Sequence, residues 1–455
     1  MAGFLVRDMS NHLKRMMNRR CPLLLPSVLL LSSAVPEFAA SVTRRSVSSY
    51  APPNNEEDNE LLDFPGGKVP FTATLNFLQG IKEERVPCFR VLNEDGKLIN
   101  HTHNDDLSED LAVKIYRHMV TLQIMDSIFY DAQRQGRISF FVTTMGEEAI
   151  NIASAAALES DDIVVPQYRE AGVLLWRGFT LQDFANQCFS NKGDSCKGRQ
   201  MPVHYGSSTH NYFTVASTIA SQTPHAVGVG YSLKMDKKNA CAVTFFGDGG
   251  SSEGDFHGAL NFAAVLEVPV VFICRNNGFA ISTPLSDQFR SDGVVAKGAA
   301  YGVRSIRVDG NDALAVYIAV REAREMAVKE GIPILIEALT YRSGHHSTSD
   351  DSTKYRSADE IERWKSARHP IRRFRKYIES NGWWSHEMEV HLRNDVRDNK
   401  VISAIEQAEE EEKPRVAELF TDVYDVLPSN LLEQEHSLRD VVSKFPHLYP
   451  SHIPL

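Results

Sequence analysis

Residues 241–280 read CAVTFFGDGGSSEGDFHGALNFAAVLEVPVVFICRNNGFA. The first six residues are apolar and favour a strand, which ends abruptly at the tripeptide 247–249. Residues 254–266 have the composition of a helix, and residues 268–274 are a second short run rich in β-branched side chains. The succession of strand, loop, helix and strand predicts a βαβ unit in a parallel sheet that is buried on both faces.

Both predicted strands end in polar residues, at 247–249 and at 275–277. Ligands of such sheets bind beyond the carboxyl ends of the strands, so both clusters fall at the ligand-binding edge. Asp248 offers a carboxylate oxygen and Asn277 a side-chain carbonyl oxygen. Magnesium takes about six oxygens, most of them from phosphate and water. The following helix N-terminus attracts anions. The pattern therefore predicts a diphosphate held through a divalent metal.

Two other phosphate-binding motifs do not fit this stretch. A dinucleotide fingerprint needs glycine where Ser252 stands, and no Gly-Lys-Ser/Thr sequence precedes the helix. A glycine-rich turn without a ligand remains an alternative for GDG alone. The paired asparagines about thirty residues later argue against it.

The GDG and NN motifs at this spacing look like the thiamine diphosphate motif. The wording of residues 247–284 resembles the family of α subunits of the branched-chain 2-oxoacid dehydrogenase E1 component. The resemblance extends from about residue 107 to the C-terminus. Four further segments carry it: QYREAGVL at 167–174, GRQMPVHYG at 198–206, RVDGND at 307–312 and YRSGHHSTSDDSTKYRS at 341–357.

The resemblance implies which residues contact the cofactor. They are Tyr168, Arg169, Ser217, Ile219, Asp248, Gly249, Gly250, Arg275, Asn277 and His346. Without it, an isolated arginine such as Arg169 is more often a surface residue. A planar guanidinium suits a diphosphate, and the apolar Ile219 would support the bent thiamine. The magnesium ligands implied are Asp248, Asn277 and the backbone carbonyl of Phe279.

A structural potassium site is implied beside Ser217. Its oxygen donors would be Ala216, Thr218, Ser221 and Gln222. The usual family pattern has proline at position 218 and threonine at position 221. Ser221 keeps the hydroxyl, whereas Thr218 changes the stiffness of the backbone.

His346 is the expected catalytic residue. A histidine in a Gly/Ser loop is by itself more often a surface residue, but the resemblance implies a place beside the reactive end of the cofactor. An imidazole with a pKa near neutrality could exchange protons there with a substrate or a lipoyl sulfur. Ser347 and Ser357 match serines that a dedicated kinase phosphorylates in the family. Only two large side chains, Tyr341 and Tyr355, are expected to hold this loop.

The activity implied is oxidative decarboxylation of branched-chain 2-oxoacids, with thiamine diphosphate, Mg²⁺ and K⁺ as cofactors. The implied partners are a β subunit in an α₂β₂ heterotetramer, a lipoyl-bearing acyltransferase component, a regulatory kinase and a phosphatase. The β subunit would supply the glutamate that activates the aminopyrimidine. Two alternatives stay open: the α subunit of the pyruvate dehydrogenase E1 component, and a diphosphate-binding regulatory protein without catalysis.

The composition is that of a soluble globular protein, and it limits the partners. The chain has 455 residues and a formal net charge of −10, which argues against a nucleic-acid partner. Its six cysteines form no CxxC pair and no metal-binding spacing, which suits a reducing compartment.

The N-terminus is basic, in contrast to the acidic chain as a whole. Residues 1–50 carry seven basic and two acidic side chains. This bias is typical of an organellar transit peptide, and the arginine pairs favour the mitochondrial matrix over secretion. The apolar run 22–35 is too short for a membrane span.

The predicted fold is α/β, a doubly wound, mostly parallel sheet with helices on both faces. Four regions are expected: a transit peptide at 1–50, a linker and arm at 51–106, the cofactor-binding domain at 107–385, and a helical region with a docking tail at 386–455. Helices are predicted at 108–135, 147–158 and 313–330. Further strands are predicted at 162–165, 301–308 and 333–340.

Overall fold

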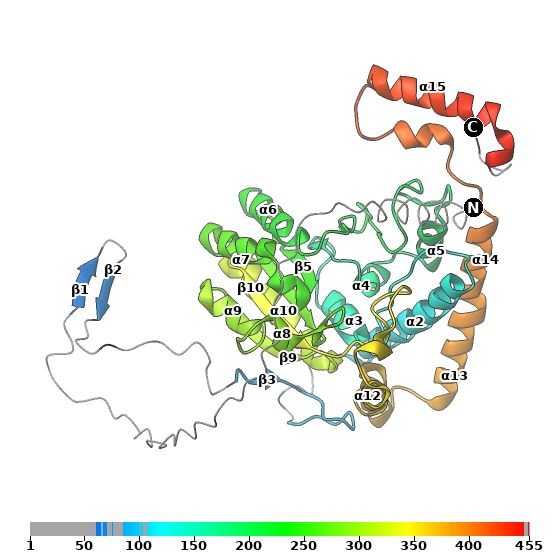
Figure 1. Ribbon diagram of the computed structural model, residues 1–455. Helices are drawn as coiled ribbons and strands as arrows, with labels where there is room; N and C mark the ends of the chain where they lie inside the picture. Colours follow the sequence, from blue (N-terminus) through cyan, green and yellow to red (C-terminus); the bar gives the residue numbers. More distant parts are fainter. Residues whose placement is uncertain are drawn as a thin grey trace, which may run out of the picture. The chain divides into compact units, whose positions relative to one another are not determined.

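The structure, a computed structural model, describes residues 61–64, 67–70, 75, 85–100, 102, 107–449 and 454 (Figure 1). The predicted transit peptide at 1–50 lies outside the described residues. The chain divides into two compact units, Met1–Phe77 and Leu78–Leu455. In the first unit, β1 (Leu61–Phe64) pairs antiparallel with β2 (Gly67–Pro70).

The second unit is built on a parallel sheet of six strands. In spatial order the strands are β3 (Cys88–Phe89), β9 (Arg304–Asp309), β10 (Ile334–Leu339), β6 (Val270–Asn276), β5 (Ala242–Gly247) and β4 (Ile163–Val165). Each neighbouring pair is parallel, so all six carboxyl ends lie at one edge. The predicted α/β class is confirmed. A short antiparallel pair, β7 (Phe279–Ala280) and β8 (Thr283–Pro284), follows β6.

Successive side chains of a strand point to opposite faces of the sheet, so the apolar strands contribute to two hydrophobic cores. On β6, Val271 and Ile273 join one buried cluster, with side chains of α2 (Glu109–Arg134), α3 (Glu148–Ala156) and α10 (Ala313–Glu330). On the other face of β6, Val270, Phe272 and Cys274 join a second cluster. That cluster includes side chains of α6 (Gln222–Met235) and α7 (Gly254–Leu266). Both faces of the sheet are therefore covered by helices, the doubly wound arrangement.

The long helix α2 begins and ends as predicted. Ser108 caps its N-terminus and accepts a hydrogen bond from the backbone of Leu111, while Glu109 and Asp110 occupy the first turn. Gly136 follows the C-terminus with a φ of +77°, a conformation that glycine adopts easily.

The strand predicted at 301–308 begins later, at Arg304, because a short helix, α9 (Val295–Ala300), and its turn occupy the preceding residues. The remaining helices of this part are α4 (Ala171–Trp176), α5 (Leu181–Phe189) and α8 (Leu285–Gln288).

The C-terminal region is helical, as predicted. Helices α11 (Ala358–Ala367) and α12 (Pro370–Ser380) precede it, within the range predicted for the cofactor-binding domain. The region itself contains α13 (His386–Asn394), the π-helix η5 (Asp395–Ile402), α14 (Ser403–Glu410) and α15 (Ser429–Lys444). Throughout the described ranges, each helix is too short or too polar to cross a bilayer.

Candidate active site

A cavity of about 270 Å³ lies at the carboxyl edge of the sheet. Nine of the ten residues expected to contact the cofactor line it, together with Phe279. They come from the segments after β4, β5, β6 and β10, and from the loop before α6. The nine are Tyr168, Arg169, Ile219, Asp248, Gly249, Gly250, Arg275, Asn277 and His346. Residues up to 178 positions apart thus meet beyond the carboxyl ends of the strands, where parallel sheets bind their ligands.

Two buried guanidiniums face this cavity without a carboxylate partner. Arg169 is 2% exposed and donates to the backbone carbonyls of Thr143 and His346. Arg342 is 1% exposed and donates to the carbonyl of Ile281 and the hydroxyl of Tyr355, both at 3.0 Å. Within the part of the chain that the structure describes, neither arginine forms an ion pair. A buried cation without a counterion is costly, so this arrangement favours an anionic ligand.

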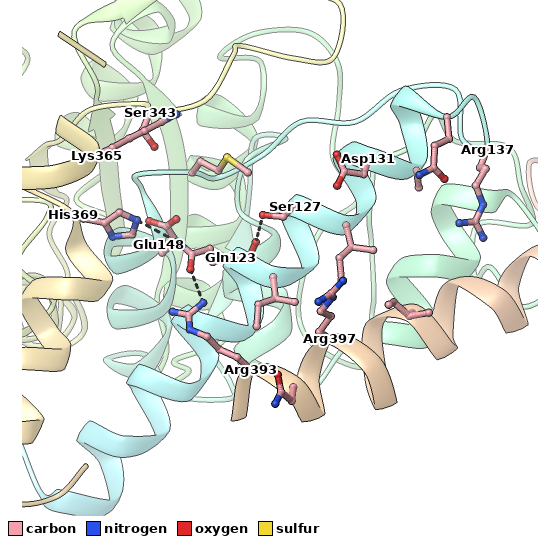
Figure 2. A pocket seen from close by; sticks show the side chains of 17 residues that line it. Gln123, Ser127, Asp131, Arg137, Glu148, Ser343, Lys365, His369, Arg393 and Arg397 are labelled. Atoms are coloured by element: carbon pink, nitrogen blue, oxygen red, sulfur yellow. Dashed lines mark hydrogen bonds between the residues drawn. The ribbon is translucent and has the colours of Figure 1, made fainter. Parts of the chain in front are cut away.

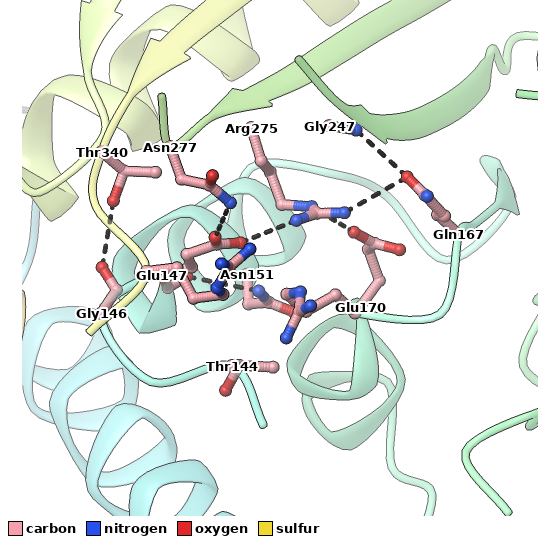
Figure 3. A network of polar contacts seen from close by, with 12 residues as sticks. Thr144, Gly146, Glu147, Asn151, Gln167, Glu170, Gly247, Arg275, Asn277 and Thr340 are labelled. Atoms are coloured by element: carbon pink, nitrogen blue, oxygen red, sulfur yellow. Dashed lines mark hydrogen bonds and ion pairs between the residues drawn. The ribbon is translucent and has the colours of Figure 1, made fainter. Parts of the chain in front are cut away.

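Arg275 differs, because its charge is neutralised within the protein. Its Nη1 lies 2.7 Å from Oε2 of Glu147, and its Nε lies 2.5 Å from Oε1 of Glu170 (Figure 3). Both carboxylates are fully buried, and Oε1 of Gln167 is a weaker third acceptor at 3.4 Å. Arg275 lines the cavity as expected, but the unpaired positive charge comes from Arg169 and Arg342.

The expected magnesium ligands also face the cavity. Asp248 is 1% exposed, and one of its carboxylate oxygens accepts from Nε2 of Gln288 at 2.7 Å. Burial raises the pKa of Asp248, although the hydrogen bond from Gln288 acts in the opposite direction. Asn277 binds Glu147 through its amide nitrogen at 2.8 Å. In the described part of the chain, no group of three His, Cys, Asp or Glu side chains could hold a metal. Asp248 and Asn277 offer a carboxylate and an amide oxygen, which are hard donors of the kind that magnesium binds.

His346 lies between the two free guanidiniums. Its Nδ1 is 3.4 Å from Nη2 of Arg169 and 3.3 Å from Nη1 of Arg342, and Tyr168 packs edge-on against its ring. Burial and these two positive charges lower the pKa of His346 to about 3. The expectation of a pKa near neutrality took no account of this burial or of the second arginine.

Polar contacts hold the loop that carries His346, in addition to its two tyrosines. Arg356 donates to the backbone carbonyls of Arg342 and Gly344, at 2.5 Å and 2.8 Å. Asp350 accepts from the backbone amide of His346 at 2.8 Å and from the hydroxyl of Tyr355 at 2.6 Å. Tyr341 and Tyr355 are therefore not the only anchors of this loop, because polar contacts that a count of large side chains overlooks also hold it.

Ser217 is the one expected cofactor contact outside the cavity lining. It is exposed, and its hydroxyl lies 2.6 Å from Nε2 of His204. In the expected potassium loop, Ser221 donates to the backbone carbonyl of Thr218 at 3.0 Å. Gln222 is buried and donates to the carbonyl of Phe245 at 2.8 Å. Ala216 is exposed.

The two serines expected to be phosphorylated have different settings. Ser347 is buried, at 8% exposure, and its hydroxyl accepts from the backbone amide of Ser349 at 3.2 Å. Ser357 is exposed and caps α11 by accepting from the backbone amide of Glu360 at 3.1 Å.

Sequence reasoning missed three residues of this site. Arg342 stands two residues after the last predicted strand, so the rule that ligands bind beyond strand ends could have found it. Gln167 lies in a quoted motif but was assigned no role, and it accepts from the backbone amide of Gly247 at 3.1 Å. Glu147 had no local signal, because it stands at the start of a helix far from both motifs.

A second and larger cavity, of about 850 Å³, is lined mainly by residues of α2, with further residues from α11, α13 and η5 (Figure 2). None of the expected site residues lines it. Glu148 does, while the preceding Glu147 reaches the first site. The first turn of α3 therefore stands between two cavities.

The family described as "Dehydrogenase E1 component" has a sequence model that matches residues 116–417 of this chain. The chain belongs to the dehydrogenase E1 component family. The match spans five of the six strands of the parallel sheet, all except the edge strand β3, and every strand end at the cavity. It implies dependence on thiamine diphosphate.

Several E1 relatives are similar over most of their length. "2-oxoisovalerate dehydrogenase subunit alpha 2, mitochondrial" of Arabidopsis thaliana is 65% identical over 90% of this chain and 87% of its own. The alpha 1 subunit of the same plant is 66% identical over 87% of this chain and 84% of its own. The human "2-oxoisovalerate dehydrogenase subunit alpha, mitochondrial" is 47% identical over 89% of this chain and 92% of its own. These names favour the branched-chain interpretation over the pyruvate alternative.

The residues present fit the cofactor that the E1 family implies. Arg169 and Arg342 supply positive charge without an internal counterion, and Asp248 supplies a buried carboxylate. Gly249 allows β7 to pack closely against this turn, because a Cβ at position 249 would lie 2.7 Å from Cβ of Ala280. An anionic diphosphate with a divalent cation complements both sets of charges.

Proposed function

We propose that this chain is the α subunit of the E1 component of a branched-chain 2-oxoacid dehydrogenase complex. It acts on 3-methyl-2-oxobutanoate (2-oxoisovalerate) and related 2-oxoacids and transfers the acyl group to a lipoyl carrier. The observation that carries the proposal is the pair of buried, unpaired guanidiniums beside Asp248 in one cavity. The names of the relatives supply the substrate class.

Each residue has a role in this proposal. Asp248, Asn277 and the carbonyl of Phe279 hold Mg²⁺. Arg169 and Tyr168 bind the diphosphate, and Ile219 supports the thiamine. When bound, thiamine diphosphate supplies the carbon nucleophile and the electron sink for decarboxylation. His346 holds or moves a proton next to the substrate or lipoyl sulfur. Asp350 holds the backbone of His346, and the two free arginines lie beside its ring.

The active unit we propose is α₂β₂, with the β subunit supplying the glutamate that activates the aminopyrimidine. The partners are a lipoyl-bearing acyltransferase, a kinase that modifies Ser347 and Ser357, and a phosphatase. K⁺ bound by Ala216, Thr218, Ser221 and Gln222 would stabilise the loop before α6. We place the protein in the mitochondrial matrix, with residues 1–50 as a transit peptide.

Reconstituted α₂β₂ tests this proposal. Calorimetry should detect thiamine diphosphate binding that requires Mg²⁺, and the specificity constant for 3-methyl-2-oxobutanoate should exceed that for pyruvate. The reverse order would favour the pyruvate enzyme. Cofactor binding without turnover of either acid would favour a regulatory protein. Turnover by the isolated α chain would contradict the role given to β.

A further inference from the structure

Glu147 connects two residues that approach the cavity from β6. It precedes α3, and its side chain is 0% exposed. Its Oε2 lies 2.7 Å from Nη1 of Arg275, and its Oε1 lies 2.8 Å from Nδ2 of Asn277 (Figure 3). One carboxylate therefore holds an arginine and an asparagine that are two positions apart at the end of the same strand.

The contact with Asn277 decides which end of its amide faces the cavity. A carboxylate has only acceptor oxygens, so it binds the NH₂ end of an amide and not the C=O end. The other end, Oδ1, then remains for the backbone amide of Phe279, at 3.2 Å, and for a cation. Of the two ends of an asparagine amide, only the oxygen can bind magnesium. An asparagine with the opposite orientation would present two protons to the metal.

We infer that Glu147 is a positioning residue for the divalent cation. It keeps the carbonyl oxygen of Asn277 toward the cavity and so sets the Mg²⁺ affinity of the cofactor site. The inference rests on the proposed function, because it takes Asn277 as a magnesium ligand. It assigns a role to a residue that touches neither the cavity nor the metal directly.

Glu170 provides a matched control within the same network. It is equally buried and pairs with the same guanidinium, through Nε of Arg275 at 2.5 Å. It forms no hydrogen bond with Asn277 in the described structure. Glu147→Gln and Glu170→Gln each remove one buried charge next to Arg275, but only the first places an amide against the amide of Asn277.

The test uses α₂β₂ reconstituted with each variant. Binding of thiamine diphosphate is measured by calorimetry at increasing Mg²⁺, and thermal unfolding is recorded without cofactor. We expect Glu147→Gln to raise the half-saturating Mg²⁺ concentration at least tenfold. Glu170→Gln should change it by less than twofold, while both variants lower the unfolding temperature similarly. Equal Mg²⁺ shifts in the two variants, or no shift in Glu147→Gln, would overturn the inference.

A second experiment exchanges the donor and the acceptor of the hydrogen bond between Asn277 and Glu147. It keeps the inference testable if the Glu147→Gln protein does not assemble. Asn277→Asp places a carboxylate against Glu147 and should weaken Mg²⁺ binding. Adding Glu147→Gln to it lets the new amide donate to the new carboxylate, so Mg²⁺ affinity should recover at least fivefold relative to Asn277→Asp alone. Absence of recovery would contradict the inference. Failure of the wild-type protein to bind the cofactor with Mg²⁺ would instead contradict the proposed function.

Discussion

Arg169 donates through Nη2 to the backbone carbonyl of His346 at 2.9 Å, across 177 positions of sequence. The same nitrogen lies 3.4 Å from Nδ1 of the imidazole. The arginine that should bind the diphosphate thus also positions the residue that should move protons. Both proposed roles, cofactor binding and proton transfer, are therefore expected to depend on one guanidinium.

We therefore expect Arg169→Lys to impair both functions. A lysine keeps the charge but cannot donate in two directions from one plane. Hydrogen bonds to charged groups contribute about 1.5–3 kcal/mol each, or roughly ten- to a hundredfold in affinity. Calorimetry should show weaker thiamine diphosphate binding, and the rate of lipoyl acylation should fall with it. Arg177→Lys is the control, since Arg177 also donates to backbone carbonyls but lies outside the cavity lining. An unchanged affinity in Arg169→Lys would contradict this assignment.

In the cofactor-free protein, His346 should stay neutral across the physiological range. Burial, Arg169 and Arg342 lower its pKa to about 3. Because the folded-state pKa lies below that of the unfolded chain, this contribution to stability is present above pH 6.5 and is lost as pH falls toward 3. NMR of ring-labelled histidine should show no titration of His346 above pH 5. Arg342→Gln, or added pyrophosphate, should raise the pKa. Titration near pH 6.5 in the free protein would refute this prediction.

Glu148 should make the protein less stable at alkaline pH. Burial raises its pKa from 4.5 to about 8, and Asp126, with a pKa raised to about 7, acts in the same direction. Between these values the unfolded chain loses a proton that the folded protein keeps, so stability falls as pH rises from 4.5 to 8. Glu148→Gln should raise the unfolding temperature at pH 8 and leave it nearly unchanged at pH 4.5. Glu325→Gln, at an exposed position of α10, is the control. A similar pH dependence in wild type and Glu148→Gln would exclude Glu148 as the cause.

A negative charge at Ser347 should stop acyl transfer. The residue is buried, and its carbonyl accepts from the backbone of Asp350, whose carboxylate anchors the His346 loop. A phosphate adds about −1.5 to −2 charge, which repels Asp350 and cannot remain buried. We expect Ser347→Glu to reduce lipoyl acylation at least tenfold.

The matched change Ser357→Glu should have a much smaller effect on acylation. Ser357 is exposed and only caps α11, so the expected cost is about 1 kcal/mol of local helix stability. Both variants should be compared in single-turnover acylation of the lipoyl domain. Wild-type acylation by Ser347→Glu would exclude the switch.

Residues 241–280 were sufficient to predict the central βαβ unit. Helix α7 has the bounds that its composition predicted. The strands on either side of it are short apolar runs, which are typical of a buried parallel sheet. Asp248 and Asn277 followed from the strand-end rule, which is local. Arg169, Ile219 and His346 could be assigned only through the family resemblance, since an isolated arginine, isoleucine or histidine carries no local signal. The edge strand β3 could not be predicted, because two residues have no periodicity.

The sequence by itself determined the fold class, the edge of the sheet that binds a ligand, and the residues that reach it from β5 and β6. Hydrophobic periodicity and strand-end chemistry are properties of neighbouring residues, so they can be read from the chain. The tertiary structure alone decided which arginine remains unpaired. Glu147 and Glu170 neutralise Arg275, while Arg169 and Arg342 keep their charge for a ligand. Electrostatic pairing acts over distance in space, and here the partners lie 105 and 128 positions apart in the chain.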